Sequence, residues 1–283
     1  MLPDDGGPAH AGAPVASVRT RSVIEATKLL MAKGRRQQRR FLADGPQVVA
    51  EAVAAAAAGR VAIHQVFVTE DALDRSAGLV NEAQSLGASM IICDEPALSK
   101  VSGTHHPQGI VAVVDMPVPK FDVRDESTQL IVALDRISDP GNLGTIIRTA
   151  AAAGADAVVL SAGCVDPYND KSVRSSTGSI FHVPVLEDVD LAEIARDCVS
   201  AGMQVFAADA GGATLDSPGI AETLSRPTMW VFGSEAHGLS DDVHRAATST
   251  VAVPHYGTAE SLNVASAAAV CVFASAMAQR SSA

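Results

Sequence analysis

The sequence predicts an α/β protein of two domains, in which a small layered domain precedes a domain built on a mainly parallel sheet. Three observations support this prediction. The 283 residues suffice for two ordinary cores. Short apolar runs alternate with alanine-rich runs of helical length in both halves. Between the halves, a segment rich in proline and charge breaks the periodicity, as linkers do. We expect a disordered tail at 1–18, a small α/β domain at 19–116, a linker at 117–127 and a larger domain at 128–283.

The composition is typical of a soluble globular protein, because 47% of the residues are hydrophobic and 19% are charged. No apolar run reaches the roughly 18 residues that a membrane helix needs. Residues 1–8 are acidic and rich in Pro and Gly, unlike a signal peptide. The four cysteines show no CxxC spacing, so neither a zinc site nor a disulfide framework is indicated. We expect a cytoplasmic protein with no membrane segment and no metal.

In the first half, the local signals place helices and strands alternately. Pro46 stands in the first turn of an alanine-rich helix and Gly59 follows its last turn, which is where these residue types are favoured. Gly87 ends a second helix in the same way. Such alternation indicates a small layered α/β domain. The predicted strands are 41–45, 63–68, 89–93 and 109–114, and the predicted helices are 22–32, 46–58, 77–86 and 96–101.

In the second half, buried-looking strands again alternate with helices. Runs such as 130–134 and 229–232 are continuously apolar, which is typical of strands covered on both faces. Strands separated by helices imply a mainly parallel sheet. The predicted strands are 130–134, 157–160, 183–186, 204–207, 229–232 and 250–253, and the predicted helices are 142–153, 171–176, 191–201, 241–246 and 262–278.

The charge is unevenly distributed. The formal net charge is −11, which by itself argues against nucleic-acid binding. Residues 19–40, however, hold eight Arg and Lys against one Glu, so that this segment carries +7 and the remainder −18. A charge run of this kind is usually a solvated face. Arginines beside glutamines also suit an RNA backbone, and on that reading the candidate RNA contacts are Arg35, Arg36, Arg39 and Arg40.

Three stretches of the second half share one plan, in which an apolar strand leads into a Gly or Pro turn and then into polar side chains. A strand that ends at such a turn leaves backbone N–H groups free at the sheet's carboxyl edge, where ligands bind. Along the chain the stretches read Asn142-x-Gly144-x-x-x-Arg148, Gly233-x-Glu235-x-x-Gly238-Leu239, and Pro254-x-x-Gly257-x-x-x-Ser261-Leu262-Asn263-Val264.

These ordered motifs closely resemble those of the SpoU/TrmH branch of the SPOUT RNA methyltransferases. The resemblance covers residues from about 128 to the C-terminus, and more loosely the first half, where 41–45 is similar to the opening of the family's ribosomal-protein-type RNA-binding domain. Asp44 stands there where Glu is more usual. The resemblance implies a C-terminal α/β-knot domain with a deep trefoil knot, acting as a homodimer. It also implies methyl transfer from S-adenosylmethionine to a ribose 2′-hydroxyl.

The site residues follow from the same resemblance. It implies that Arg148 activates the hydroxyl, whereas a lone Arg in an apolar helix is more often half of an ion pair. Ser261 and Asn263 could equally be helix N-caps, and Glu235 could be a carboxylate that stabilises a helix N-terminus. The predicted catalytic residues are Asn142, Arg148, Glu235, Ser261 and Asn263. The predicted cofactor contacts, largely through backbone groups, are Gly233, Val253, Leu262 and Asn263.

Two further stretches hold charged or histidine side chains. Lys171 and Arg174 match a family stretch near the RNA, and a charged surface helix explains them as well. The adjacent His105 and His106 invite a metal interpretation, but neighbouring side chains point apart and no carboxylate follows at ligand spacing, so a loop is favoured.

The N-terminal domain favours 23S rRNA over tRNA, and residues 35–45 are similar to the thiostrepton-resistance type of enzyme. Alternatives are a tRNA 2′-O-methyltransferase and a non-catalytic RNA-binding protein that keeps the fold. A Rossmann-type nucleotide enzyme is disfavoured, because no GxGxxG follows a strand.

Overall fold

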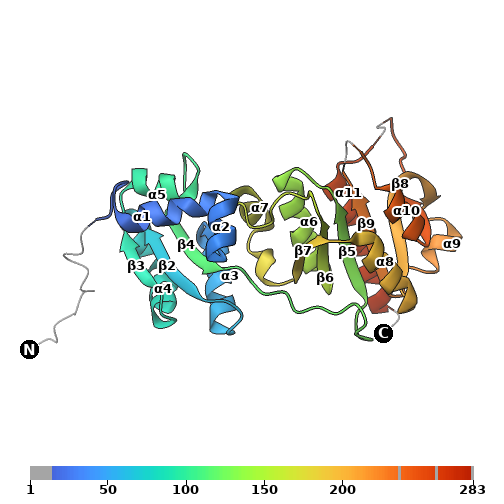
Figure 1. The fold of residues 1–283 in the computed structure, drawn as a ribbon, viewed down its shortest axis with the longest axis horizontal. Helices are drawn as coiled ribbons and strands as arrows, with labels where there is room; N and C mark the ends of the chain where they lie inside the picture. Colours follow the sequence, from blue (N-terminus) through green and yellow to red (C-terminus); the bar gives the residue numbers. More distant parts are fainter. Residues whose placement is uncertain (1–14, 235–236, 259–260, 282–283) are drawn as a thin grey trace, which may run out of the picture.

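The computed structural model describes residues 15–234, 237–258 and 261–281 and consists of two α/β units (Figure 1). Each unit is built on its own sheet, and an extended segment after the first sheet leads into the second (Figure 1). The predicted α/β class with a smaller N-terminal unit is confirmed.

The first unit holds a four-stranded mixed sheet in the order β1-β4-β2-β3. β4 pairs antiparallel with both β1 and β2, and β2 pairs parallel with β3. The apolar strand β4 lies inside the sheet, where all of its residues except the last are buried. The strands are β1 (Arg40–Asp44), β2 (Ile63–Val68), β3 (Ser89–Ile92) and β4 (Ile110–Asp115).

The helices of this unit depart from prediction at two places. The predicted helix 22–32 is a shorter helix, Arg21–Thr27, followed by a 3₁₀ turn, and the unpredicted helix Ala32–Gln38 comes next and carries Arg35 and Arg36. A further helix begins seven residues before its predicted start, because Glu70 and Asp71 occupy its first turn, where acidic side chains are favoured. The helices are α1 (Arg21–Thr27), η1 (Lys28–Leu30), α2 (Ala32–Gln38), α3 (Pro46–Ala57), α4 (Glu70–Ser85) and α5 (Glu95–Ser102).

The second unit holds a six-stranded sheet in the order β10-β8-β9-β5-β6-β7, in which every pair is parallel. The predicted parallel sheet is therefore confirmed, and the trefoil knot stays a prediction. β8 is longer than predicted, because its end pairs again with β10 beyond a register shift at Thr250. The strands are β5 (Leu130–Asp135), β6 (Ala157–Ser161), β7 (Val185–Val189), β8 (Gln204–Thr214), β9 (Thr228–Gly233) and β10 (Ser249–Ala252).

Helices cover this sheet on both faces (Figure 1). α11 packs on α6, β9 and β5, whereas α8 packs with α10 over β8 and β6. α7 lies against α6 and also against β1 of the first unit. The helices are α6 (Pro140–Ala153), α7 (Asp170–Ser176), η2 (Ser179–Phe181), α8 (Leu191–Ser200), α9 (Pro218–Ala221), α10 (Asp241–Ala246) and α11 (Val264–Ser281).

The two units share one apolar core. The ring of Phe41 in β1 lies 5.2 Å from that of Tyr168 and 5.7 Å from that of Phe181, measured between centroids. Arg60 of the first unit donates to the Phe181 carbonyl. His182 pairs with Glu51 across the same boundary at 2.8 Å. Because aromatic packing and polar contacts both cross it, the boundary is an extensive interface.

α11 is long and apolar enough, by length and composition alone, to cross a membrane. In the fold, however, one of its faces is buried on the second sheet. Trp230 Nε1 of β9 donates to Ser275 Oγ of α11 at 2.9 Å, and both side chains are fully buried. The helix is thus bound into the core by packing and by a buried hydrogen bond.

The predicted disorder of residues 15–18 is wrong. Ala16 is buried and bridges Cys93 at the edge of the first sheet, where its N–H donates to the Ile92 carbonyl at 2.8 Å. The chain is ordered at this point because its backbone hydrogen bonds with the sheet edge satisfy the N–H and C=O groups of Ala16. Residues 1–14 lie outside the described part.

Candidate active site

The carboxyl ends of β8, β9 and β10 meet at one edge of the second sheet, and a pocket of about 200 Å³ lies there. Gly233, Val253 and Leu262, the three residues predicted to hold the cofactor by backbone groups, line it together. Parallel strands end at the same edge, so motifs far apart in sequence converge. Other lining residues include Phe232, Val251, Ser261, Asp209, Ser234 and Gly238.

Gly233 is required by a close backbone crossing. A Cβ at this position would lie 2.3 Å from the carbonyl carbon of Gly238 and 2.5 Å from the nitrogen of Leu239. The loop returns through an antiparallel bridge between Ser234 and Gly238, where φ of Gly238 is +60°. Any side chain at 233 would push the loop away from the strand. Glu235, predicted to be catalytic, lies within this loop but outside the described residues.

Asp135, at the end of β5, ties three loops of this edge together. Its carboxylate accepts the backbone N–H of Ser240 at 2.8 Å and the hydroxyl of Ser161 at 3.1 Å. Its neighbour Arg136 also reaches the Gly238 carbonyl at 3.5 Å. Burial, the largest single influence, raises the pKa of Asp135, but the hydrogen bonds from Ser240 and Ser161 together hold it below its usual value. Sequence reasoning missed Asp135, although a carboxylate directly after a continuously apolar strand was the available signal.

Asn142 and Asn263 bring the first and third motifs into contact. Asn263 Nδ2 donates to Asn142 Oδ1 at 2.9 Å. Asn263 Oδ1 accepts the Ala265 N–H at 3.0 Å and so caps α11, while Asp139 Oδ1 caps α6 through the Asn142 N–H at 2.8 Å. The amide pair therefore joins the N-termini of two helices. Ser261 is exposed, lines the pocket and precedes the cap.

Arg148 lies on α6 with an exposed side chain, and its Nη1 donates to Thr177 Oγ1 at 3.3 Å. Thr177 ends α7 in the left-handed conformation, with φ of +51°. The arginine is therefore held at the junction of α6 and α7 by one long hydrogen bond. An exposed guanidinium remains available for a polyanionic substrate.

The predicted RNA contacts of the second unit are engaged within the protein. Lys171 Nζ lies 3.2 Å from Asp139 Oδ2, the residue that caps α6. The Asn142 N–H and then Lys171 hold the pKa of Asp139 below its usual value. Arg174 pairs with Asp170 at 2.7 Å and, across the boundary of the units, with Asp44 at 3.2 Å. α7 is thus a bridge between the units as well as a charged helix.

The predicted RNA contact at Arg35 is wrong. Its side chain is only 3% exposed and pairs with Asp166 of the second unit, with 2.9 Å between Nε and Oδ2. Its Nη1 donates to the carbonyls of Leu29 and Leu30, both at 2.8 Å. A guanidinium with its donors committed inside the protein cannot also bind a phosphate. Arg36 and Arg39 are exposed, and Arg40 lies 3.4 Å from Asp115.

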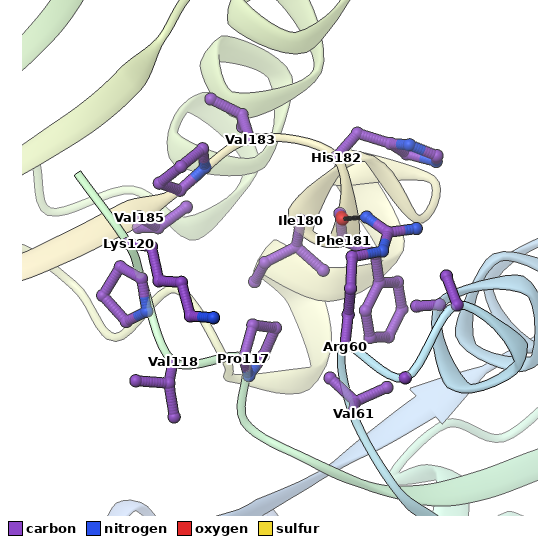
Figure 2. Close-up of a pocket in the computed structure, with 15 residues that line it drawn as sticks. Arg60, Val61, Pro117, Val118, Lys120, Ile180, Phe181, His182, Val183 and Val185 are labelled. Atoms are coloured by element: carbon purple, nitrogen blue, oxygen red, sulfur yellow. Dashed lines mark hydrogen bonds between the residues drawn. The ribbon is translucent and has the colours of Figure 1, made fainter.

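A larger hollow of about 460 Å³ lies between the units, away from the motifs. Figure 2 shows its walls, formed by the end of α3, the segment after β4 and the turn that includes η2. The Arg60 guanidinium meets the Phe181 carbonyl there, and the Lys120 amine extends into the hollow (Figure 2). Since none of the predicted catalytic residues that the structure describes lines it, the smaller motif pocket is the better candidate site.

Both units of the chain resemble domains of known proteins. Residues 129–273 match the model of the SpoU rRNA Methylase family, and residues 21–112 match that of an MRM3-like substrate binding domain. The chain is 32% identical to the Bacillus subtilis 23S rRNA (guanosine(2553)-2′-O)-methyltransferase RlmP, over 92% of this chain and 97% of that protein.

Two solved structures have the same fold over nearly their whole length. The AdoMet-bound rRNA methyltransferase from Sinorhizobium meliloti is 29% identical, with a TM-score of 0.73 over 92% of this chain and 97% of that one. The SpoU methyltransferase AviRb from Streptomyces viridochromogenes, in complex with AdoMet, is 27% identical, with a TM-score of 0.75 over 93% of this chain and 99% of that one.

Proposed function

Because this chain belongs to the SpoU rRNA methylase family, we propose that it transfers a methyl group from S-adenosylmethionine to a ribose 2′-hydroxyl of 23S rRNA. One observation carries the proposal. Residues from three separate motifs meet at one edge of the second sheet, where Gly233, Val253 and Leu262 line a single pocket. Asn263, next to Leu262, contacts Asn142 of the first motif. The named activity of the Bacillus subtilis relative supports the choice of 23S rRNA.

The lining of the motif pocket suits the proposed cofactor. Phe232, Val251 and Val253 give apolar walls for an adenosine, and the crossing at Gly233 leaves backbone groups close to the cavity. Asp209 supplies a carboxylate for a positively charged ligand. When bound, S-adenosylmethionine supplies an electrophilic methyl carbon on its sulfonium, so the protein has mainly to position two reactants.

In this proposal Arg148 stabilises the negative charge that develops on the ribose oxygen, since its guanidinium is exposed and always charged. The Asn142–Asn263 pair positions the loop that carries Ser261 and Leu262, because it joins the starts of α6 and α11. Asp135 positions the loop around Gly238. Glu235 keeps its predicted role in the site.

We further propose that the enzyme is a cytoplasmic homodimer, since its proposed substrate is ribosomal RNA and one face of α11 carries exposed apolar side chains. Val270, Phe273 and Met277 are 44%, 37% and 63% exposed, and their spacing places them on a single stripe of the helix. A second copy of the chain would cover this stripe.

Methyl transfer tests the proposed function directly. Radiolabelled S-adenosylmethionine is offered with unmodified 23S rRNA, 16S rRNA and bulk tRNA, to wild type and to Arg148→Ala. We expect label in 23S rRNA only, mapped to one ribose 2′-oxygen and lost in the variant. Label in tRNA alone would overturn the choice of substrate. Absence of label in every RNA, with the cofactor bound, would overturn the proposed activity.

A further inference from the structure

A third pocket, of about 640 Å³, lies between the two units at the end of β1, and we call it the Asp44 pocket. Asp44, Gly45 and the loop 104–108 contribute from the first unit, and Arg174 and Thr177 from the second. Thr177 Oγ1 is also the acceptor for Arg148 Nη1. The Asp44 pocket therefore borders the proposed catalytic arginine, although no motif residue within the described ranges lines it.

One carboxylate oxygen of Asp44 accepts no hydrogen bond from the described residues. Asp44 is 5% exposed, and its Oδ2 accepts from Ser102 Oγ at 2.9 Å and from Arg174 Nη1 at 3.2 Å. Its Oδ1 is buried and has no hydrogen-bond donor among the residues that the structure describes. Burial raises the pKa of Asp44, against the opposing effects of Ser102 and Arg174. A buried acceptor without a donor is costly, so a ligand that brings an N–H group gains by pairing with it.

The rest of the lining favours a nucleobase over a phosphate. Arg174 is already paired with Asp44 and Asp170, so it offers little charge to a phosphate. His105 and His106 are exposed, and their side chains make no hydrogen bond or ion pair with other described residues. Unpaired RNA bases stack on flat side chains, histidine included, and present N–H donors on their Watson–Crick edges.

We propose that the Asp44 pocket holds one unpaired nucleobase of the substrate RNA, close to the nucleotide whose ribose meets Arg148. An N–H of the base edge donates to Asp44 Oδ1, and the face of the base stacks on His105 or His106. The proposal rests on the RNA-modifying function proposed above. It assigns Asp44 and the loop 104–108 to the choice of RNA site, separately from the basic face of α2.

Two variants test this pocket. His105→Ala/His106→Ala removes the stacking surface with exposed side chains only. Asp44→Asn leaves the amide oxygen with Ser102 and Arg174 and puts the amide N–H₂ where the base must donate. Asn81→Ala/Gln84→Ala, on the exposed side of α4, is the matched control. The measurements are Kd and KM for unmodified 23S rRNA, the affinity for S-adenosylmethionine, and Tm.

We expect both pocket variants to raise Kd and KM for RNA by about 10-fold, because the histidine variant loses a stacked base and Asp44→Asn loses a hydrogen bond to the base edge. Cofactor affinity and the control variant stay at wild-type values. Unchanged RNA affinity in the double histidine variant would overturn the proposal, whether or not Asp44→Asn folds. If the wild type binds RNA without methylating it, the proposed function fails, while the affinities of the variants still decide for or against the pocket.

Discussion

At the scale of single residues, Arg148 is the side chain on which the proposed chemistry most depends. Its exposed guanidinium makes one long hydrogen bond to Thr177, so replacing it should leave the fold intact. We predict that Arg148→Lys lowers kcat by about 100-fold, because an ammonium does not reproduce the planar two-point contact with a developing oxyanion. Single-turnover methyl transfer would measure this. Arg196→Lys, exposed on α8, is the control. Near-normal turnover would remove Arg148 from the mechanism.

Asp135 gives a prediction about pH. Its folded pKa is below the usual value, so its stabilisation is present above the unfolded pKa of about 3.9 and is lost as the pH falls through the folded pKa. Asp135→Asn should cost about 1–3 kcal/mol at pH 7, since an amide cannot accept from both Ser240 and Ser161 as a carboxylate does. Urea unfolding should show the two proteins converging below about pH 4. A gap that is independent of pH would mean that the carboxylate's charge is not what matters.

Motif residues were predictable because their positions follow from local rules. Asn142, Gly233 and Leu262 each stand where a strand or turn leads into a helix or loop, and parallel strands bring such ends together. Arg35 was not predictable, because its partner Asp166 lies 131 residues away in sequence and burial is decided by that contact. From the sequence, Asp44 was only a residue of the stretch 41–45 that resembles the family. That its Oδ1 lacks a hydrogen-bond donor among the described residues, beside a pocket between the units, is visible only in the folded structure.

At the scale of elements, the contact between α6 and α7 sets the place of Arg148. A Cβ on Gly144 would lie 2.4 Å from the Ser172 carbonyl oxygen and 2.6 Å from Ser175 Cβ, so the two helices touch there. We predict that Gly144→Ala costs about 1–3 kcal/mol of stability by overpacking. Denaturant unfolding would measure it. Gly78→Ala, in α4 with open space around it, should instead stabilise by up to about 1 kcal/mol. Equal effects of the two changes would contradict a tight crossing.

The exposed stripe of α11 gives the prediction for the dimer. Phe273→Glu places a charge in the middle of the stripe, and burying it against a second copy is unfavourable. The wild type should be a dimer and the variant a monomer, with light scattering after size exclusion as the measurement. Val199→Glu, on α8 at 41% exposure, should stay dimeric. A wild type that is monomeric at assay concentration, or a dimeric Phe273→Glu, would place the interface elsewhere.

Elements with clear local signals were predicted well, and the misses have physical causes. The strand at 63–68 and the helix at 241–246 match their predicted bounds. α2 was missed because its arginines and Gly34 show no helical apolar period, whereas the contact of Arg35 with Asp166 of the second unit holds the helix in place. β8 was predicted short, because its second pairing with β10 begins only after a register shift, which no local pattern announces.

At the scale of the molecule, the two units are coupled through buried charge and aromatic packing. Sequence periodicity predicts a linker at 117–127, but it does not predict which faces of the units meet. Phe41 lies more than a hundred residues from Tyr168 and Phe181 in sequence, and the structure packs the three rings, tilted to one another, across the boundary. The predicted knot and the proposed dimer likewise concern long-range order that apolar periods do not encode.

Substitutions of two neighbouring arginines on α2, Arg35 and Arg36, distinguish a role in holding the units together from a role in RNA binding. Arg35→Met removes one partner of a buried ion pair and should cost about 3–5 kcal/mol of stability, because Asp166 is left without its guanidinium. At temperatures where the variant is folded, its RNA affinity should keep the wild-type salt dependence.

Arg36→Met removes an exposed charge on the same helix, and it should change RNA binding but not stability. Its stability should stay near wild type, while the slope of log K against log salt falls by about one. If Arg35→Met instead weakens the salt dependence at unchanged stability, Arg35 contacts RNA and the interface is more open than the Arg35–Asp166 pair implies.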